Sequence, residues 1–259
     1  MQAFDVAKFS RQGQGKFGST LYYFRTLEST NLLAFKLAAQ KAEEGTLVLA
    51  DQQIAGKGRS GRSWFSPAGV NLYFTFIARP RTTDLHYLPF MAALAVVRAF
   101  DKIGLQADLK WPNDLLVNSK KICGILIETS MEENCLQFAV IGWGINVNVR
   151  EFPAEIAEKA TSIAIEKGGE IAREIMLASL LFEFESLYEK INVMNWDRFC
   201  SELEKHSSYL RDCPVQLDQG ETSVEGVTRG LDVYGGLILD TPEGVKTFYA
   251  GDVQSCRKK

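Results

Sequence analysis

Histidine and paired cysteines are scarce in this chain of 259 residues. The two histidines are His86 and His206, and the five cysteines are widely scattered, with no C-x-x-C pair among them. This pattern supports neither a structural zinc site nor a disulfide framework. A Ser-His or Cys-His signature of nucleophilic catalysis is also missing. The chain therefore falls outside the zinc-binding and disulfide-rich classes.

Long apolar runs and an excess of one charge are also missing. No segment approaches the roughly 18 apolar residues of a membrane span, and residues 1–18 lack the apolar core of a secretory signal. The net charge of −3 and the pI of about 5.6 argue against broad electrostatic binding to nucleic acid or an anionic membrane. We therefore expect a cytoplasmic protein in which positive charge is local.

The patterns that remain predict an α+β fold, with a mixed sheet backed by helices and a small all-β module. We expect a tail or loose strand at 1–18, a main domain at 19–209 and a small β-barrel at 210–259. Apolar runs and turn residues predict strands at 20–27, 46–50, 70–78, 108–111, 114–118, 121–129 and 136–148. Helices are expected at about 30–44, at 88–103 and in two segments between 170 and 209. Four short strands follow Pro214, the last of them spanning 244–253.

The stretch Asp51–Ser66 concentrates glycine, cationic residues and aromatic residues. It contains Gly56, Gly58, Gly61, Lys57, Arg59, Arg62, Trp64 and Phe65. Glycine lets the backbone approach a ligand, the cations suit an anion, and a tryptophan ring can stack. The spacing is not that of a P-loop. The stretch is interpreted as a loop that closes over phosphate groups, and the alternative is a flexible basic loop, such as an RNA-binding tip.

Three further motifs can each carry a ligand or be purely structural. Lys110–Asp114 (KWPND) is either a ligand-binding turn or a polar turn under a buried tryptophan. Lys121 heads an apolar strand in which Gly124 leaves room against the sheet, although a lysine at a strand end is usually only solvated. Gly142 and Gly144 are expected to interrupt the strand 136–148, and their motif (GWGINVN, 142–148) suggests a bulge or a close backbone approach. An asparagine at 146 can both donate and accept, as an adenine edge requires.

Taken in order, these motifs resemble those of biotin–protein ligases. The set comprises E-S-T-N, A-G-K-G-R-S-G-R-S-W-F-S-P, K-W-P-N-D, K-K-I-C-G-I-L-I-E and G-W-G-I-N-V-N, between about Leu21 and Val149. The similarity is to the short form without an N-terminal DNA-binding domain. It implies a catalytic domain of the class II aminoacyl-tRNA-synthetase type at 19–209, and an SH3-like barrel that completes the site.

The resemblance also implies a reaction and its partners. Biotin attacks the α-phosphate of ATP, normally with Mg²⁺, to give biotinyl-5′-AMP and pyrophosphate. A lysine of a biotin carboxyl carrier domain, such as that of acetyl-CoA carboxylase, then takes the biotin and releases AMP. Joining two anions requires cations, and holding both reactants in one pocket supplies up to about 7–11 kcal/mol of the barrier.

Roles for individual residues follow from the same resemblance. Arg59 and Lys121 are the candidate catalytic residues. The candidate biotin-binding residues are Ser29, Thr30, Asn31, Gln53, Lys57, Gly58, Arg59, Lys121 and Gly124. The candidate ATP- and adenylate-binding residues are Lys57, Arg59, Arg62, Trp64, Asn113, Lys121 and Asn146. Asp114 is a weak candidate ligand for Mg²⁺, and no metal site is assigned.

Two positions depart from the family's commonest loop, G-R-G-R-R-G. Lys57 lacks the planar fork of arginine, and Ser60 lacks a charge, so we expect weaker retention of the adenylate. A lipoate–protein ligase or octanoyltransferase shares the fold class and is the nearest alternative. A nucleic-acid-binding module is the alternative from another class, and residues 1–18 are too few for the DNA-binding domain of a ligase that is also a repressor. Both a monomer and a homodimer are compatible with the sequence.

Overall fold

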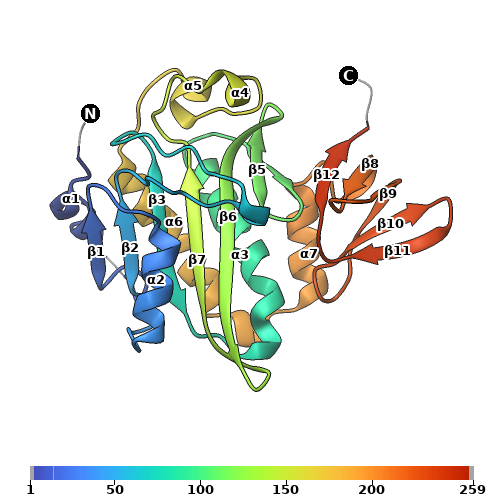
Figure 1. Ribbon diagram of the computed structural model, residues 1–259, viewed down its shortest axis with the longest axis horizontal. Coiled ribbons are helices and arrows are strands. Elements are labelled where there is room, and N and C mark those ends of the chain that lie inside the picture. The colour runs from blue at the N-terminus through green and yellow to red at the C-terminus, as the bar shows by residue number, and fades with distance from the viewer. Residues whose placement is uncertain (1–2, 14, 257–259) are drawn as a thin grey trace.

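A seven-stranded mixed sheet forms the centre of the protein, seen in a computed structural model that describes residues 3–13 and 15–256 (Figure 1). The strand order is β1-β2-β3-β7-β6-β5-β4, with β1 and β2 parallel and the other neighbouring pairs antiparallel. The strands are β1 (Leu21–Phe24), β2 (Leu47–Ala50), β3 (Leu72–Ala78), β4 (Asp108–Lys110), β5 (Asp114–Val117), β6 (Lys120–Glu132) and β7 (Cys135–Ile145). This confirms the predicted mixed sheet.

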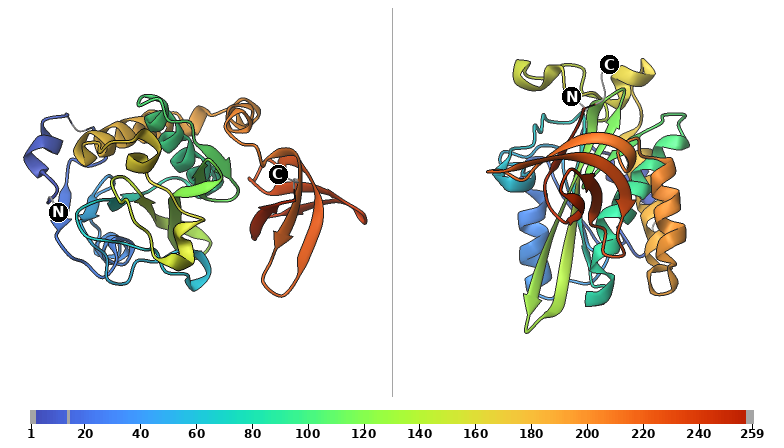
Figure 2. Two further views of the ribbon diagram at one scale, coloured as in Figure 1. Left: turned by 90° about the horizontal axis from the view of Figure 1, so that it is seen from above. Right: turned by 90° about the vertical axis from the view of Figure 1, so that its right-hand side faces the viewer.

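Helices cover both faces of this sheet. Helix α2 (Thr30–Ala39) lies on one face, and α3 (Leu88–Asp101) and α6 (Arg173–Tyr188) lie on the other, as the view along the sheet shows (Figure 2). Because both faces are covered, β2 and β3 are buried along their whole length. Helix α2 ends earlier than predicted, because Lys41 adopts a left-handed φ of 66°. Among the described residues, no helix has the length and apolar character that a membrane span needs.

The first described residues are part of the core, so the prediction of a tail at 1–18 is wrong. Helix α1 (Val6–Ser10) begins at Asp5, whose side chain accepts a hydrogen bond from the backbone of Lys8. Phe4, Phe9 and Phe17 are buried in the main core. The polar composition of the segment concealed these three aromatic anchors, and positions 1, 2 and 14 lie outside the described residues.

The C-terminal residues form a separate five-stranded antiparallel sheet beside the main one (Figure 1). Its order is β11-β10-β9-β8-β12, with β8 (Arg211–Asp218), β9 (Ser223–Leu231), β10 (Leu237–Thr241), β11 (Gly244–Phe248) and β12 (Asp252–Ser255). The single strand predicted for 244–253 is therefore two strands. The strand is interrupted between them, where Gly251 takes a φ of 140° that favours glycine. The predicted barrel boundary at 259 includes 257–259, which are outside the described residues.

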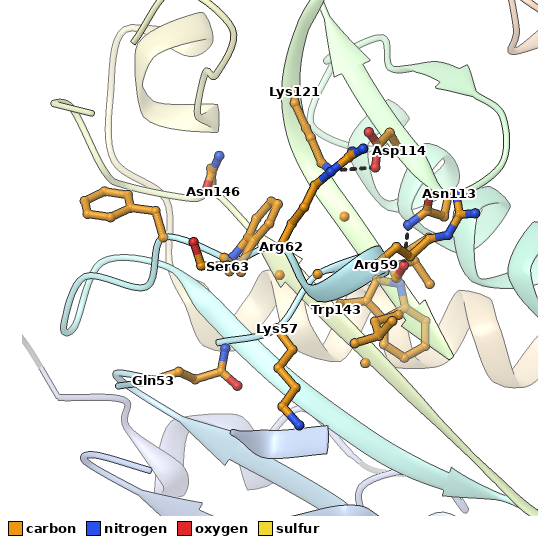
Figure 3. A pocket seen from close by; sticks show the side chains of 18 of the residues that line it. Gln53, Lys57, Arg59, Arg62, Ser63, Asn113, Asp114, Lys121, Trp143 and Asn146 are labelled. Atoms are coloured by element: carbon orange, nitrogen blue, oxygen red, sulfur yellow. Dashed lines mark hydrogen bonds and ion pairs between the residues drawn. The ribbon is translucent and has the colours of Figure 1, made fainter. Parts of the chain in front are cut away.

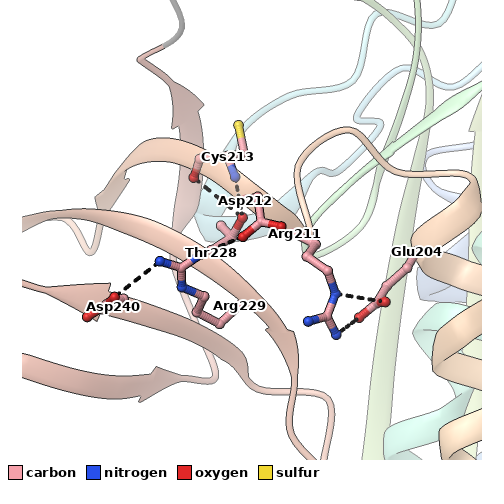
Figure 4. A network of polar contacts seen from close by, with 7 residues as sticks. All are labelled: Glu204, Arg211, Asp212, Cys213, Thr228, Arg229 and Asp240. Atoms are coloured by element: carbon pink, nitrogen blue, oxygen red, sulfur yellow. Dashed lines mark hydrogen bonds and ion pairs between the residues drawn. The ribbon is translucent and has the colours of Figure 1, made fainter.

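The remaining short elements are α4 (Ala154–Ala157), α5 (Ile163–Lys167), α7 (Trp196–Lys205) and the 3-10 turns η1 (Arg59–Gly61), η2 (Thr82–Tyr87) and η3 (Ile191–Val193). Polar contacts join the main part to the C-terminal sheet. At the end of α7, Glu204 accepts two hydrogen bonds from Arg211 at 2.7 and 3.0 Å, which secures the start of β8 (Figure 4). The buried Trp111 indole donates to the carbonyl of Gly235, at 3.1 Å, in the C-terminal part. The tryptophan of K-W-P-N-D thus anchors one sheet to the other.

Candidate active site

The glycine-rich stretch Asp51–Ser66 folds as a narrow loop with its own hydrogen bonds. The backbone N–H of Gly58 donates to the carbonyl of Arg62 at 2.7 Å, and that of Trp64 donates to Gly56 at 2.9 Å. The tip is the turn η1, in which Ser60 and Gly61 take left-handed φ values of 54° and 74°. A glycine is therefore needed for its conformation at 61, and Ser60 tolerates the same region at a cost.

Side chains tie this loop to the sheet and to the C-terminal strand β12. Arg59 donates to the side-chain oxygen of Asn113 at 3.1 Å, and Asn113 donates to the carbonyl of Ile125 at 2.6 Å (Figure 3). Arg62 forms an ion pair with Asp252, and Arg59 lies 4.0 Å from the same carboxylate. Asp252 thus brings the C-terminal part to the loop, as the resemblance led us to expect.

The ring of Trp64 lies against the sheet at two glycines. A Cβ atom at Gly144 would lie 2.3 Å from the indole nitrogen, and one at Gly124 would lie 3.0 Å from the ring. The indole N–H is buried and has no hydrogen-bond partner among the described residues. The room that Gly124 leaves is therefore occupied by Trp64 in this structure, and contact between Gly124 and a ligand stays a prediction.

The strand that carries Gly142 and Gly144 is continuous, so the predicted interruption of 136–148 is wrong. Strand β7 pairs with β3 in one unbroken register from Ala139 to Ile145. The other half of that prediction, close approach, is confirmed, because a Cβ atom at Gly142 would lie 1.9 Å from the side-chain oxygen of Asn31. Two glycines in a strand here mark crowding above the sheet, and they do not mark a bulge.

A cluster of amides and hydroxyls closes one end of the cavity. The Gln53 side-chain oxygen accepts from the backbone N–H of Thr30 at 2.8 Å and from its hydroxyl at 3.1 Å. Asn31 donates to the Glu128 carboxylate at 2.9 Å, and Ser29 caps α2 through Leu32. These groups are held in fixed orientations before any ligand arrives, which suits recognition of a small polar group.

Lys121 and Asp114 form an ion pair on neighbouring strands at the other end. Their charged atoms are 2.6 Å apart, and the Lys121 ammonium also lies 5.3 Å from the centre of the Trp64 ring (Figure 3). The Lys121 side chain is 34% exposed, so a ligand in the cavity has access to it. The lysine is therefore placed to exchange its carboxylate partner for an anionic ligand.

Asn146 follows β7 and is almost fully buried. Its side-chain nitrogen donates to the carbonyl of Thr161 at 3.0 Å, and its side-chain oxygen accepts from Asn71 at 3.4 Å. The residue still lines the cavity. An amide with fixed ends at a cavity wall is consistent with the predicted contact to a nucleobase, although the structure does not test that contact.

Every residue assigned to the site from sequence lines one cavity of about 240 Å³. Sequence reasoning missed several other members of the lining, which are Ser63, Phe65, Ile125, Leu126, Gly142, Trp143, Gly144, Phe152, Ile156, Lys159, Ala160 and Asp252. The motif around Gly142 marked three of these in advance. No local pattern marks Asp252 or the segment 152–160.

The cavity is positively charged, in contrast to the chain. Its lining holds five cations, Lys57, Arg59, Arg62, Lys121 and Lys159, against the two carboxylates Asp114 and Asp252. The whole chain has a formal net charge of −3. This focusing of positive charge suits two anionic reactants that must approach each other.

Comparison with known proteins agrees with this geometry. A sequence model described as the Biotin/lipoate A/B protein ligase family matches residues 23–146, and one described as the Biotin protein ligase C terminal domain matches residues 214–254. The Biotin--[acetyl-CoA-carboxylase] ligase of Paracoccus denitrificans is 32% identical, over 87% of this chain and 96% of that protein. The Bifunctional ligase/repressor BirA of Bacillus subtilis (strain 168) is 36% identical, over 92% of this chain and 74% of that protein.

The fold is shared with solved structures of such enzymes. The biotin protein ligase from Aquifex aeolicus in complex with biotin and ATP superposes with a TM-score of 0.78, at 31% identity, over 93% of this chain and 100% of that one. The same architecture therefore accompanies the sequence similarity in both the catalytic and the C-terminal parts. This chain belongs to the biotin/lipoate A/B protein ligase family, among its biotin protein ligases.

Proposed function

We propose that this protein is an ATP-dependent biotin–protein ligase that modifies a biotin carboxyl carrier domain. The observation that carries the proposal is that one cavity contains both groups: a polar cluster with fixed side-chain orientations at one end and a set of cations at the other. In the first step a biotin carboxylate oxygen bonds to the α-phosphorus of ATP, and the bond to pyrophosphate breaks. In the second step a lysine amine attacks the carbonyl carbon of biotinyl-5′-AMP, and AMP leaves.

The polar cluster is the end that suits the biotin head. Ser29, Thr30, Asn31 and Gln53 offer hydroxyl and amide groups, which can donate to and accept from a ureido ring. Much of their hydrogen-bonding capacity is already used within the protein, so their orientations are set before binding. Gly124, Lys57 and Gly58 complete the contacts that we assign to biotin.

The cationic end is the site of the chemistry. Lys121 and Arg59 are the catalytic residues in this proposal, because each places a positive charge where the carboxylate and phosphate groups meet. Lys57 and Arg62 add charge from the loop, Asn113 orients Arg59 at 3.1 Å, and Trp64 and Asn146 contact the adenine. Since Trp64 lies on the sheet in this structure, its ring must turn or shift to stack on the base.

Magnesium enters this reaction with ATP. The described residues include no group of three or more His, Cys, Asp or Glu side chains that could hold a metal ion. Asp114 is paired with Lys121 at 2.6 Å and is a single carboxylate. One carboxylate together with ATP phosphates suits Mg²⁺, because this ion usually retains several water ligands and needs few ligands from the protein.

The proposal extends to the partners and the compartment. Both a monomer and a homodimer are compatible with the proposal. The expected partner is the carrier domain of acetyl-CoA carboxylase or a related carboxylase, in the cytoplasm. The net charge of −3 over the 259 residues disfavours DNA as a partner.

A reconstituted assay tests the function. The protein is mixed with labelled biotin, ATP-Mg²⁺ and a purified carrier domain, and label on the domain is measured by mass. The expected result is one biotin per domain, and biotinyl-5′-AMP alone when the domain is omitted. Replacement of biotin with lipoate or octanoate is expected to abolish the labelling. Labelling by those acids and not by biotin would assign the chain to the lipoate branch instead.

A further inference from the structure

The Asn146 amide is held in one of its two possible orientations by groups that cannot be exchanged. Its nitrogen faces the carbonyl of Thr161 at 3.0 Å, and a carbonyl can only accept. Its oxygen faces the Asn71 side-chain nitrogen at 3.4 Å, and that group can only donate. Both ends of the amide are therefore determined by their partners.

Asn71 is itself fixed by the backbone around it. It is fully buried, and its side-chain oxygen accepts from the N–H groups of Val147 at 2.8 Å and Val149 at 3.4 Å. Because backbone N–H groups can only donate, the Asn71 nitrogen has to point toward Asn146. Its own backbone carbonyl accepts from Arg173 at 3.0 Å, which fixes the residue at the start of β3. The two asparagines thus form a series of hydrogen bonds, and backbone groups set its donor-to-acceptor direction.

A fixed amide distinguishes between purines, whereas an amide that can rotate does not. Adenine carries a donor at position 6 with acceptors beside it, and guanine carries an acceptor at position 6 with a donor at N1. Rotation by 180° exchanges the oxygen and nitrogen of an asparagine, so a free side chain can match either base. An amide that is held in one orientation matches one base and leaves the other with two like groups facing each other.

We infer that Asn71 is a specificity-determining residue for the nucleotide, acting through Asn146. Asn71 holds the Asn146 amide so that the amide oxygen accepts from the 6-amino group of adenine. A guanine in the same position would place its 6-oxygen, an acceptor, against the Asn146 oxygen, which is also an acceptor. This inference rests on the proposed function, in which ATP is the nucleotide. Asn71 does not line the cavity, so it is a positioning residue and does not contact the substrate.

The test is the ratio of kcat/KM for ATP to that for GTP in biotin activation, measured as pyrophosphate release. Asn71→Asp keeps the acceptor for Val147 and Val149 but removes the donor to Asn146. The ratio is expected to fall by about tenfold or more, mainly through a higher KM for ATP, while the affinity for biotin is retained. Because both nucleotides are compared on one preparation, a reduced folded fraction cancels from the ratio.

The matched control is Asn148→Asp. Asn148 is an asparagine beyond the end of β7 with two hydrogen bonds to the backbone of Ile171, at 2.9 and 3.0 Å, and it is not part of the cavity. Its substitution is expected to lower stability and to leave the ATP:GTP ratio unchanged. Asn71→Ser, whose shorter side chain does not reach Asn146, serves if the aspartate variant does not fold.

The outcomes separate the two proposals. A wild-type protein that releases no pyrophosphate with biotin and ATP would reject the proposed function. A wild-type protein that is active but equally efficient with GTP would reject the inference alone. The same holds if the ratio in Asn71→Asp or Asn71→Ser equals that of the wild type, or if Asn148→Asp lowers it equally.

Discussion

The two walls of the cavity are built in different ways. The sheet wall consists of β6 and β7, which pair in continuous register across Gly124, Gly142 and Gly144. The loop wall runs from Lys57 to Trp64, has a few backbone hydrogen bonds of its own, and depends on side-chain contacts for its position. One of these contacts uses Arg62, whose side chain is 66% exposed.

This difference assigns a task to each wall. Backbone pairing in a sheet resists local opening, whereas an exposed loop with side-chain anchors opens at low cost. The sheet wall therefore supplies fixed geometry, and the loop wall supplies positive charge and controls access. Changes in the sheet wall are expected to have large effects that cannot be relieved, and changes at the tip of the loop are expected to have small ones.

The largest effect is expected for Gly142→Ala in the sheet wall. The added methyl group would lie 1.9 Å from the Asn31 side-chain oxygen, which accepts from the Thr75 hydroxyl at 2.6 Å. The Asn31 nitrogen donates to Glu128 and the carbonyl of Leu126. Biotin activation should fall by more than about 100-fold, because the polar cluster is displaced, and the free energy of unfolding should fall by about 1–3 kcal/mol. Pyrophosphate release and urea denaturation measure the two effects.

Gly169→Ala is the control, since nothing lies within 4 Å of the position of its added methyl group. It should be neutral in both measurements. Biotin activation at the wild-type rate in Gly142→Ala would mean that the sheet wall is as adaptable as the loop.

The second effect concerns charge supplied by the sheet wall, at Lys121. Lys121→Met removes a cation that we place at the carboxylate and phosphate, so biotin activation should fall by about 100-fold. The ion pair with Asp114 is partly exposed, so stability should change by less than about 1 kcal/mol. Single-turnover kinetics and denaturation separate these two effects.

Lys120→Met is the matched control, because Lys120 is the preceding residue on the same strand and does not line the cavity. Equal losses of activity in the two variants would show that Lys121 has no special role.

The same comparison explains what could be predicted from sequence. Glycines, cations and K-W-P-N-D carry their signal in residue type and local spacing, so the sequence alone identifies the sheet wall and the loop. Asp252 lies 190 residues from its partner Arg62, and nothing around it in sequence marks it as part of the site. A contact that is made only by the folded chain leaves no local pattern.

The errors have a related physical cause. Local patterns indicated that Gly142 and Gly144 interrupt their strand, because a glycine pair can mean a bulge or crowding from above, and only the packing of Asn31 and Trp64 distinguishes the two. The residues at the N-terminus resemble a tail in sequence, because their average polarity outweighs three phenylalanines. Burial of Phe4, Phe9 and Phe17 depends on where the rest of the sheet lies.

The third effect tests the base of the loop, which is anchored more firmly than its tip. Asp51 is buried, lies 2.8 Å from the Arg173 guanidinium and accepts a hydrogen bond from the Tyr23 hydroxyl at 2.5 Å. Burial and this bond to Asp51 raise the pKa of Tyr23 above its ordinary value of 10.0. Tyr23→Phe should lower the free energy of unfolding by about 1 kcal/mol at pH 7.

The pH dependence of that difference follows from the direction of the pKa shift. The folded state keeps the Tyr23 proton at a pH where the unfolded chain has lost it, so the stabilisation is complete below pH 10.0 and declines above it. Denaturation of both proteins between pH 7 and pH 11 should show the gap closing, since all other tyrosines are shared. A gap that stays constant would mean that the hydroxyl does not interact with Asp51.

The smallest effect is expected at the tip of the loop, at Ser60. Ser60 has a left-handed φ of 54°, so an arginine there bears the same backbone strain as the serine and adds one exposed cation. An exposed charge contributes about 0.2–1 kcal/mol, so Ser60→Arg should slow the release of biotinyl-5′-AMP by about 1.4- to fivefold. Salt should reduce this slowing of release, because the charge is screened.

Release is measured by trapping free biotinyl-5′-AMP without a carrier domain, with Ser60→Gln as the uncharged control of similar length. If both variants slow release equally, bulk at the tip retains the adenylate. If neither does, the loop wall holds it through Lys57, Arg59 and Arg62.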